Sequence, residues 1–191
     1  MGGRYGMRDR VLLADIGNTY FHIYDGSKVE HLSYKEAIRK YSEEALCYIS
    51  VKEQLDSTIE EIALWKNISE QIQLQGAYET MGVDRRALCL SYDDGIFVDA
   101  GSAITVDIMQ KGEYQGGFIL PGLKAMLQAY SSISPVLDTE LNKTISLEQL
   151  PDTTKDGISY GIIASIKALI DKHKDSKKLY FTGGDGKLLS S

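Results

Sequence analysis

The chain has 191 residues, of which 43% are hydrophobic and 25% are charged, as is typical of a globular protein with one domain or two small lobes. Its net charge of −6 argues against nucleic-acid binding but leaves room for a small anionic ligand. No run of about 18 apolar residues predicts a membrane span, and residues 1–10 lack the apolar stretch of a signal peptide, so we expect a cytoplasmic protein with a leader that an expression vector could have added.

The first half of the chain alternates short apolar segments with amphipathic ones. We expect strands at 10–16, 20–25 and 45–51, and helices at 35–45, 52–65 and 84–92. The helix at 52–65 is predicted from Leu55, Ile59, Ile62 and Trp65, which recur at helical spacing.

The second half repeats the theme that opens the first, because it also begins with two apolar strands joined across a glycine turn. Strands are expected at 96–100, 103–110, 113–122 and 177–183, and helices at 123–131 and 156–172. This mixture of strands and helices predicts an α/β protein with an antiparallel hairpin at the start of each half.

The cysteines and histidines indicate neither a disulfide framework nor a metal centre. Cys47 and Cys89 lie in apolar segments and are predicted to be buried free thiols. The three histidines, His22, His31 and His173, are scattered without metal-ligand spacing, so we expect no zinc site.

Two glycine turns share one pattern of residue types. DIGNT (Asp15–Thr19) and DAGSA (Asp99–Ala103) each place an aspartate at a strand end, then a glycine, then a small polar residue. Glycine lets backbone N–H groups approach a phosphate closely, and the aspartate can hold a cation that offsets the phosphate charge. A third turn, TGGDG (Thr182–Gly186), follows the last strand and could form a platform for a base.

Each turn taken singly is more often a plain hairpin than a binding site. Three such turns in one chain favour a nucleotide site, because otherwise all three would have to be plain hairpin turns with no ligand. The only Gly-Lys pair, Gly186-Lys187, lacks the flanking residues of a Walker A sequence, so this site is not a P-loop.

Taken together, these turns resemble the superfamily of acetate kinase, hexokinase, the 70-kDa heat-shock chaperones and actin, and in detail the bacterial type III pantothenate kinases. DIGNT, GVDR (Gly82–Arg85), DAGSAIT (Asp99–Thr105) and GGFILPG (Gly116–Gly122) are similar to that family's motifs and occur in its order, between about residues 11 and 187. The resemblance implies two ribonuclease-H-like (actin-like ATPase) lobes, at 11–92 and 93–191. It also implies a homodimer whose substrate pocket lies at the interface. From the net charge and the lack of a long apolar run we expect no nucleic-acid or membrane partner.

The resemblance further assigns roles to individual residues. Asp84 would be the general base that takes the proton from the pantothenate hydroxyl, and Arg85 would pair with the pantothenate carboxylate. The residues implied to contact pantothenate are Tyr78, Gly82, Val83, Asp84, Arg85 and Thr154. Those implied to contact ATP are Asp15, Ile16, Gly17, Asn18, Thr19, Tyr20, Phe21, His22 and Ser102. Asp99 would bind a monovalent cation (K⁺ or NH₄⁺), and Asp15 would act on Mg²⁺ through the phosphates.

Structural alternatives exist for three of these residues. Asp84 could cap the helix at 84–92, Arg85 and Arg86 could form an ordinary solvated pair, and Thr154 could simply begin a helix. The capping and catalytic roles of Asp84 are compatible, because a cap fixes the position of the side chain.

The chain also departs from the family pattern. Ser102 stands where most members have threonine, Thr153 where many have asparagine, and Gly157 where most have alanine. Tyr78 precedes Gly82 by fewer residues than in many members. Members usually continue past the last glycine turn by another strand and helix, whereas this chain ends at LLSS, so we expect a C-terminal lobe that is either truncated or a short form.

These features predict ATP-dependent phosphorylation of pantothenate to 4′-phosphopantothenate, the first step of coenzyme A biosynthesis. The alternatives are a non-catalytic, actin-like nucleotide-binding regulatory protein, or a related small-molecule kinase. GVDR discriminates between them, because a binding protein has no need for Asp84 and Arg85 there.

Overall fold

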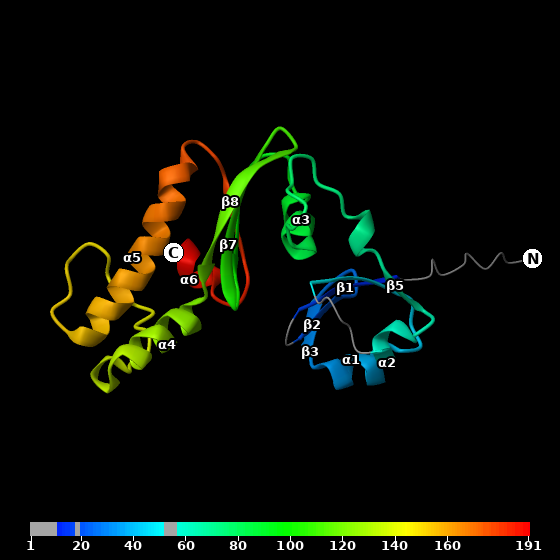
Figure 1. Ribbon diagram of the computed structural model, residues 1–191, viewed down its shortest axis with the longest axis horizontal. Helices are drawn as coiled ribbons and strands as arrows, with labels where there is room; N and C mark the ends of the chain where they lie inside the picture. Colours follow the sequence, from blue (N-terminus) through cyan, green and yellow to red (C-terminus); the bar gives the residue numbers. More distant parts are fainter. Residues whose placement is uncertain (1–10, 18–19, 52–56) are drawn as a thin grey trace, which may run out of the picture. The chain divides into compact units, whose positions relative to one another are not determined.

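The computed structural model describes residues 11–17, 20–51 and 57–191, which form two compact units. Unit 1 contains the described residues up to Gln73 together with Tyr78–Ala87, and unit 2 contains Leu74–Ala77 together with Leu88–Ser191. The chain therefore passes from one unit to the other three times. Figure 1 shows the elements of each unit in sequence colours.

Unit 1 is built on a mixed sheet with the strand order β3-β2-β1-β4-β5. Its strands are β1 (Leu12–Ile16), β2 (Phe21–Tyr24), β3 (Val29–Leu32), β4 (Leu46–Ser50) and β5 (Trp65–Asn67). The first three strands run antiparallel in a meander, whereas β4 and β5 run parallel to β1. The predicted hairpin of β1 and β2 and the buried strand β4 are confirmed.

The helical elements of unit 1 are α1 (Tyr34–Tyr41), α2 (Ser57–Glu60), the 3₁₀ turn η1 (Ser69–Gln71) and α3 (Val83–Cys89), whose last residues belong to unit 2. One face of the sheet packs against α1 and α2, and Figure 1 shows both helices on the same side of it. Because side chains alternate along a strand, Leu12, Ala14 and Ile16 enter this core while Asp15 lies on the opposite face.

The prediction of one amphipathic helix over 52–65 is wrong at its C-terminal end. Trp65 begins strand β5 and pairs with Leu46 of β4. Its buried indole Nε1 donates to the Tyr41 carbonyl at 3.1 Å. Of the predicted helix, α2 covers only Ser57–Glu60, and residues 52–56 lie outside the described part of the chain. Sheet pairing and burial of the indole outweigh the weak local preference for a helix.

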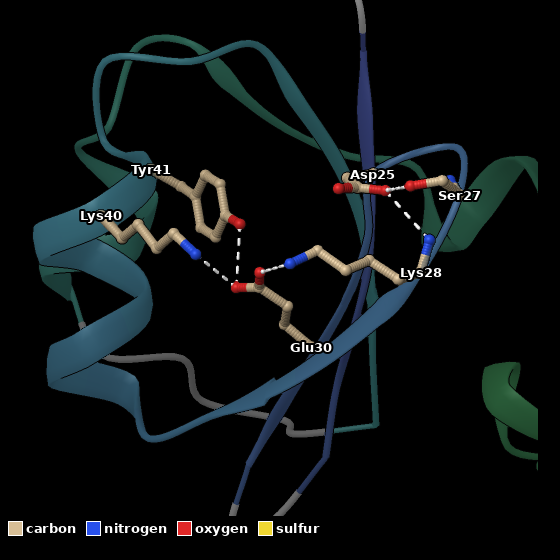
Figure 2. Close-up of polar contacts among 6 residues, drawn as sticks. All are labelled: Asp25, Ser27, Lys28, Glu30, Lys40 and Tyr41. Carbon is tan, nitrogen blue, oxygen red and sulfur yellow. Dashed lines mark hydrogen bonds and ion pairs between the residues drawn. The ribbon is translucent and has the colours of Figure 1, made fainter.

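An ion cluster joins the edge strand β3 to helix α1 (Figure 2). The carboxylate of Glu30 contacts Lys28 Nζ at 2.8 Å and Lys40 Nζ at 2.5 Å, and it accepts a hydrogen bond from the Tyr41 hydroxyl at 3.0 Å. Hydrogen bonds from the two lysines and the tyrosine lower the pKa of Glu30 from its ordinary value of 4.5 to about 2. The cluster therefore depends on an ionised Glu30.

We expect the Glu30→Gln variant to lose stability at neutral pH, and the loss to shrink in acid. Because the pKa of Glu30 is lowered on folding, its contribution is complete above about pH 4.5 and disappears as the pH falls towards about 2. Urea unfolding at about pH 7 and about pH 3 should show a smaller difference between parent and variant at the lower pH. Glu43→Gln, at an exposed position of the same unit, is the control, and a pH-independent difference for Glu30→Gln would contradict the expectation.

Unit 2 repeats the strand pattern of unit 1. Its strands are β6 (Gly95–Ala100), β7 (Ala103–Gln110), β8 (Glu113–Pro121) and β9 (Leu179–Thr182), in the order β8-β7-β6-β9. As in unit 1, the first three strands form an antiparallel meander and the fourth pairs in parallel with the first. The expected hairpin at the start of the second half is confirmed.

Residues of three helices join the hydrophobic core on one face of this second sheet (Figure 1). The helical elements of unit 2 are α4 (Leu123–Ile133), the 3₁₀ turn η2 (Pro135–Leu137), α5 (Thr154–Lys174) and α6 (Gly186–Ser190). Ile162, Ile166 and Ile170 of α5 enter the core beside Ile96 and Val98 of β6. Within the described residues, no helix has both the length and the apolar character needed to cross a membrane.

Candidate active site

In unit 1, the first glycine turn lies at the carboxyl edge of the parallel strands β1 and β4. Ile16 is opposite Ser50 in the strand register, and the Ser50 hydroxyl is 3.5 Å from the Ile16 carbonyl. The Tyr34 hydroxyl donates to the Gly17 carbonyl at 2.7 Å, and Ser50 N–H donates to Ser69 Oγ at 3.1 Å. In α/β sheets, ligands bind preferentially outside this edge.

The residues of unit 1 that are expected to contact ATP differ in the exposure of their side chains. Asp15 is half-buried on the face away from the core, and Tyr20 is exposed. The side chains of Ile16 and Phe21 are fully buried in the core, so only their backbone groups could meet a nucleotide. Asn18 and Thr19 lie outside the described residues.

His22 pairs with a histidine on the neighbouring strand. His22 and His31 are opposite each other in the register of β2 and β3, and their Nδ1 atoms are 2.5 Å apart. Burial and the neighbouring His31 ring both lower the pKa of His22. His22 is therefore mainly uncharged at neutral pH, and any contact with a phosphate would be a neutral hydrogen bond.

The GVDR sequence forms the beginning of helix α3. The helix starts at Val83, which places Asp84 inside its first turn rather than at its cap. The Asp84 carboxylate accepts a hydrogen bond from Arg85 N–H at 2.8 Å and lies over Gly82, where an added Cβ would be 2.5 Å from Oδ1. Glycine at position 82 therefore leaves room for the half-buried carboxylate.

The second arginine of this segment is not interchangeable with the first. Arg85 is only 6% exposed, and its Nη1 donates to the hydroxyl of Tyr78 at 2.6 Å. Arg86 donates from Nη1 to the Ile72 carbonyl at 2.9 Å and so braces the preceding loop. An ordinary solvated pair, the alternative considered from the sequence, is therefore wrong for Arg85 and Arg86.

The first glycine turn and the GVDR segment both lie at the carboxyl edge of the sheet in unit 1. Val51 directly follows β4, and its Cγ1 lies 4.0 Å from the Cβ position built on Gly82. Because β4 pairs with β1, this contact places Gly82 at the carboxyl edge that also carries Gly17. The structure thus places two motifs that are about sixty residues apart in the sequence at the same sheet edge.

In unit 2, the second and third glycine turns lie together at the corresponding sheet edge. Asp99 of β6 is opposite Thr182 of β9 in the register, and Asp185 N–H donates to the Ala100 carbonyl at 3.0 Å. Gly183 has a φ of +83°, and an added Cβ there would be 2.5 Å from both Asp99 Oδ1 and the Ala100 carbonyl. Position 183 therefore accepts only glycine. The Asp99 carboxylate and the Ala100 carbonyl both lie close to it.

A further glycine closes the same edge. Gly122 N–H donates to the Ser102 carbonyl at 3.1 Å, and an added Cβ would be 2.5 Å from the carbonyl oxygens of Gly101 and Ser102. Gly122 also precedes helix α4, which has no side-chain cap. Ser102 itself is exposed, so its hydroxyl is available to a ligand.

Thr154 begins the long helix α5 of unit 2. Thr153 is the N-cap, and its side-chain oxygen accepts a hydrogen bond from Asp156 N–H at 3.1 Å. Thr154 is exposed, which leaves its hydroxyl free to bind a small molecule, and helix start and ligand contact are compatible roles.

The residues at these edges fit a nucleotide and a hard cation. Carboxylate and carbonyl oxygens are the ligands that K⁺ and Mg²⁺ accept, and Asp99 with the Ala100 carbonyl provides two of them beside Gly183. The glycine positions allow backbone groups to approach phosphate oxygens closely. Among the described residues there is no cluster of three histidine, cysteine or acidic side chains suited to a metal ion.

Fold and turns together define an actin-like ATPase architecture, in which each unit has an antiparallel meander followed by parallel strands. The solved component A of (R)-2-hydroxyglutaryl-CoA dehydratase from Acidaminococcus fermentans shares this fold, with a TM-score of 0.50 at 13% identity over 93% of this chain and 84% of that chain. The type III pantothenate kinase family model matches residues 50–175. The chain belongs to the type III pantothenate kinase family.

Two relatives are similar to this chain over most of its length. A type III pantothenate kinase of Helicobacter hepaticus is 42% identical over 183 residues, which cover 94% of this chain and 88% of the relative. A solved structure from Campylobacter jejuni, provisionally assigned to a Baf family of transcriptional activators, has a TM-score of 0.83 at 38% identity and covers 93% of this chain and 85% of that chain.

Proposed function

We propose that this chain transfers the γ-phosphate of ATP to the hydroxyl of pantothenate, giving 4′-phosphopantothenate and ADP at the start of coenzyme A biosynthesis. The observation that carries the proposal is the GVDR segment at the start of α3. In a chain of the type III pantothenate kinase family, it places a half-buried carboxylate beside a buried arginine at a ligand-binding sheet edge.

Asp84 is proposed as the general base. Its carboxylate accepts the hydroxyl proton of pantothenate while the hydroxyl oxygen bonds to the γ-phosphorus and the bond to the ADP oxygen breaks. Such transfers pass through a loose transition state, so a correctly positioned carboxylate within hydrogen-bond reach suffices. The hydrogen bond from Arg85 N–H holds one oxygen in place, and the second oxygen can receive the proton.

Pantothenate binding is assigned to the residues around this base. Arg85 lies beside Tyr78, to whose hydroxyl its Nη1 donates, and a guanidinium can hold a carboxylate through two parallel hydrogen bonds. Tyr78 would then be a second polar contact, while Gly82 and Val83 shape the wall. Thr154 is proposed as a further hydroxyl contact on α5.

ATP is assigned to the glycine turns. As the family resemblance implies, the turn that begins at Asp15 and the Ser102 hydroxyl are assigned to its phosphates. Mg²⁺ bound to the phosphates and a monovalent cation beside Asp99 would neutralise the charge that develops on the transferred group. We further propose a homodimer in which both copies contribute to the pantothenate pocket.

The proposal is tested by coupled measurement of ADP release with pantothenate, with and without K⁺. We expect ADP release that requires pantothenate and rises with K⁺. Asp99→Asn should weaken the response to K⁺, whereas Asp171→Asn, an exposed acid of the same unit, should leave it unchanged. No ADP release by the parent with K⁺ present would contradict the kinase proposal, and an unchanged K⁺ response in Asp99→Asn would contradict the cation site.

A regulatory role is the second candidate, and the description of the Campylobacter jejuni structure favours it. A nucleotide-binding regulator would keep the glycine turns but would not catalyse phosphate transfer to pantothenate. Tight ATP binding without pantothenate-dependent ADP release would support this candidate over the kinase.

A further inference from the structure

Asn142 ties the long loop after η2 to the first turns of helix α5. Its backbone N–H donates to Ser159 Oγ at 2.8 Å, and its side-chain Nδ2 donates to Asp156 Oδ1 at 2.7 Å. Ser159 is fully buried, and its own hydroxyl donates to the Lys155 carbonyl at 3.0 Å. One loop residue therefore contacts the helix at two points, one turn apart.

The side-chain oxygen of Asn142 is also hydrogen-bonded. Its Oδ1 accepts hydrogen bonds from Thr144 N–H at 3.0 Å and from Thr144 Oγ1 at 2.9 Å. A reversed amide would face the Thr144 N–H with another donor and the Asp156 carboxylate with another acceptor. The network therefore fixes a single orientation of the half-buried side chain.

These contacts surround Thr154 without involving it directly. Asp156 donates its N–H to the cap residue Thr153 and receives the Asn142 amide on its carboxylate. The hydrogen bond from the Asn142 side chain, and after it one from the Thr153 side chain, favour the ionised carboxylate of Asp156 and lower its pKa. The first turn of a helix usually frays, and here it is held from both the cap and the loop.

We propose that Asn142 is a positioning residue for pantothenate: by holding Asp156 and Ser159 it fixes the first turn of α5 and with it the Thr154 hydroxyl. This inference rests on the proposed contact between Thr154 and pantothenate. A side chain that only stabilised the loop would leave substrate affinity unchanged, and this difference separates the two roles.

The first test is Asn142→Ala. We expect the KM for pantothenate to rise roughly threefold to tenfold, the effect of losing one or two hydrogen bonds, with kcat and the KM for ATP unchanged. Lys143→Ala, at the exposed neighbouring position, is the matched control and should leave all three constants unchanged.

Exchanging the amide and the carboxylate between positions 142 and 156 separates a positioning effect from a general loss of folding. Asn142→Asp places a carboxylate against that of Asp156 and should raise the KM for pantothenate. Adding Asp156→Asn restores an amide–carboxylate pair in the opposite sense, and the double variant should return towards the parent value.

The outcomes distinguish this inference from the function on which it rests. If the parent is active and Asn142→Ala leaves the KM for pantothenate unchanged, or if the double variant gives no rescue, the positioning role is wrong. Calorimetric titration with pantothenate gives the same comparison without turnover. A parent that neither turns over nor binds pantothenate would contradict the proposed function and this inference with it.

Discussion

Replacing Asp84 with asparagine is expected to lower kcat by about 10²–10⁴-fold, the usual contribution of a general base, while the KM for ATP stays near the parent value. Asparagine keeps an oxygen that can accept the Arg85 N–H, so helix α3 should form as before. What the variant loses is the second carboxylate oxygen as a proton acceptor. Coupled ADP release at saturating pantothenate measures the effect.

The matched control for this variant is Glu79→Gln, which neutralises an exposed acid of the same unit close to the substrate segment. Its kcat should equal that of the parent, and both variants should melt within a few degrees of the parent. If Asp84→Asn keeps the full rate, Asp84 is not the base, although the rest of the assignment would stand.

Replacing Gly122 with alanine should destabilise unit 2 by about 1–3 kcal/mol and impair phosphate transfer, because the new methyl group collides with two backbone carbonyls that cannot rotate away. Relief requires the turn at Gly101 and Ser102 to move, and displacements of about 1 Å at a reacting centre can cost about 10²-fold in rate. Urea unfolding and kcat/KM for ATP measure the two effects.

Gly157→Ala is the control for this substitution. Gly157 lies in helix α5, and no atom is within 4 Å of its built Cβ, so alanine should raise stability by about 0.5–1 kcal/mol. If Gly122→Ala behaved like this control, the close approach at the edge of the sheet would not be needed for function.

Much of the fold could be predicted from local patterns, because the decisive signals are short in range. The antiparallel hairpins follow from paired apolar segments around glycine turns. The error at Trp65 arose because helical spacing and burial in a strand produce the same run of apolar residues, and only pairing with β4 separates them. Strand β3 was missed because it has only four residues, two of them polar, on the edge of the sheet, and so lacks a clear apolar run.

The candidate site could be named from the sequence only through its resemblance to a family. The resemblance selects Asp84 and Arg85 but gives no account of what holds them. The hydrogen bonds of Tyr34 to Gly17 and of Asn142 to Asp156 and Ser159 link residues 14 to 17 positions apart. Neither tyrosine nor asparagine carries a local signal for such a contact. The supporting role of such polar side chains can be recognised only from their hydrogen bonds in the folded structure.

The repeated passage of the chain between its units limits how the protein can be divided. The segment Leu74–Ala77 belongs to unit 2, where the Gln75 carbonyl accepts the N–H of Tyr114 at 2.9 Å. A cut after Ala87 would therefore leave this segment on the N-terminal fragment and deprive the C-terminal fragment of a backbone partner. Expressed alone, the C-terminal fragment would lack the Gln75 carbonyl that accepts the Tyr114 N–H. We expect the two fragments to fold better when they are expressed together than when each is expressed alone.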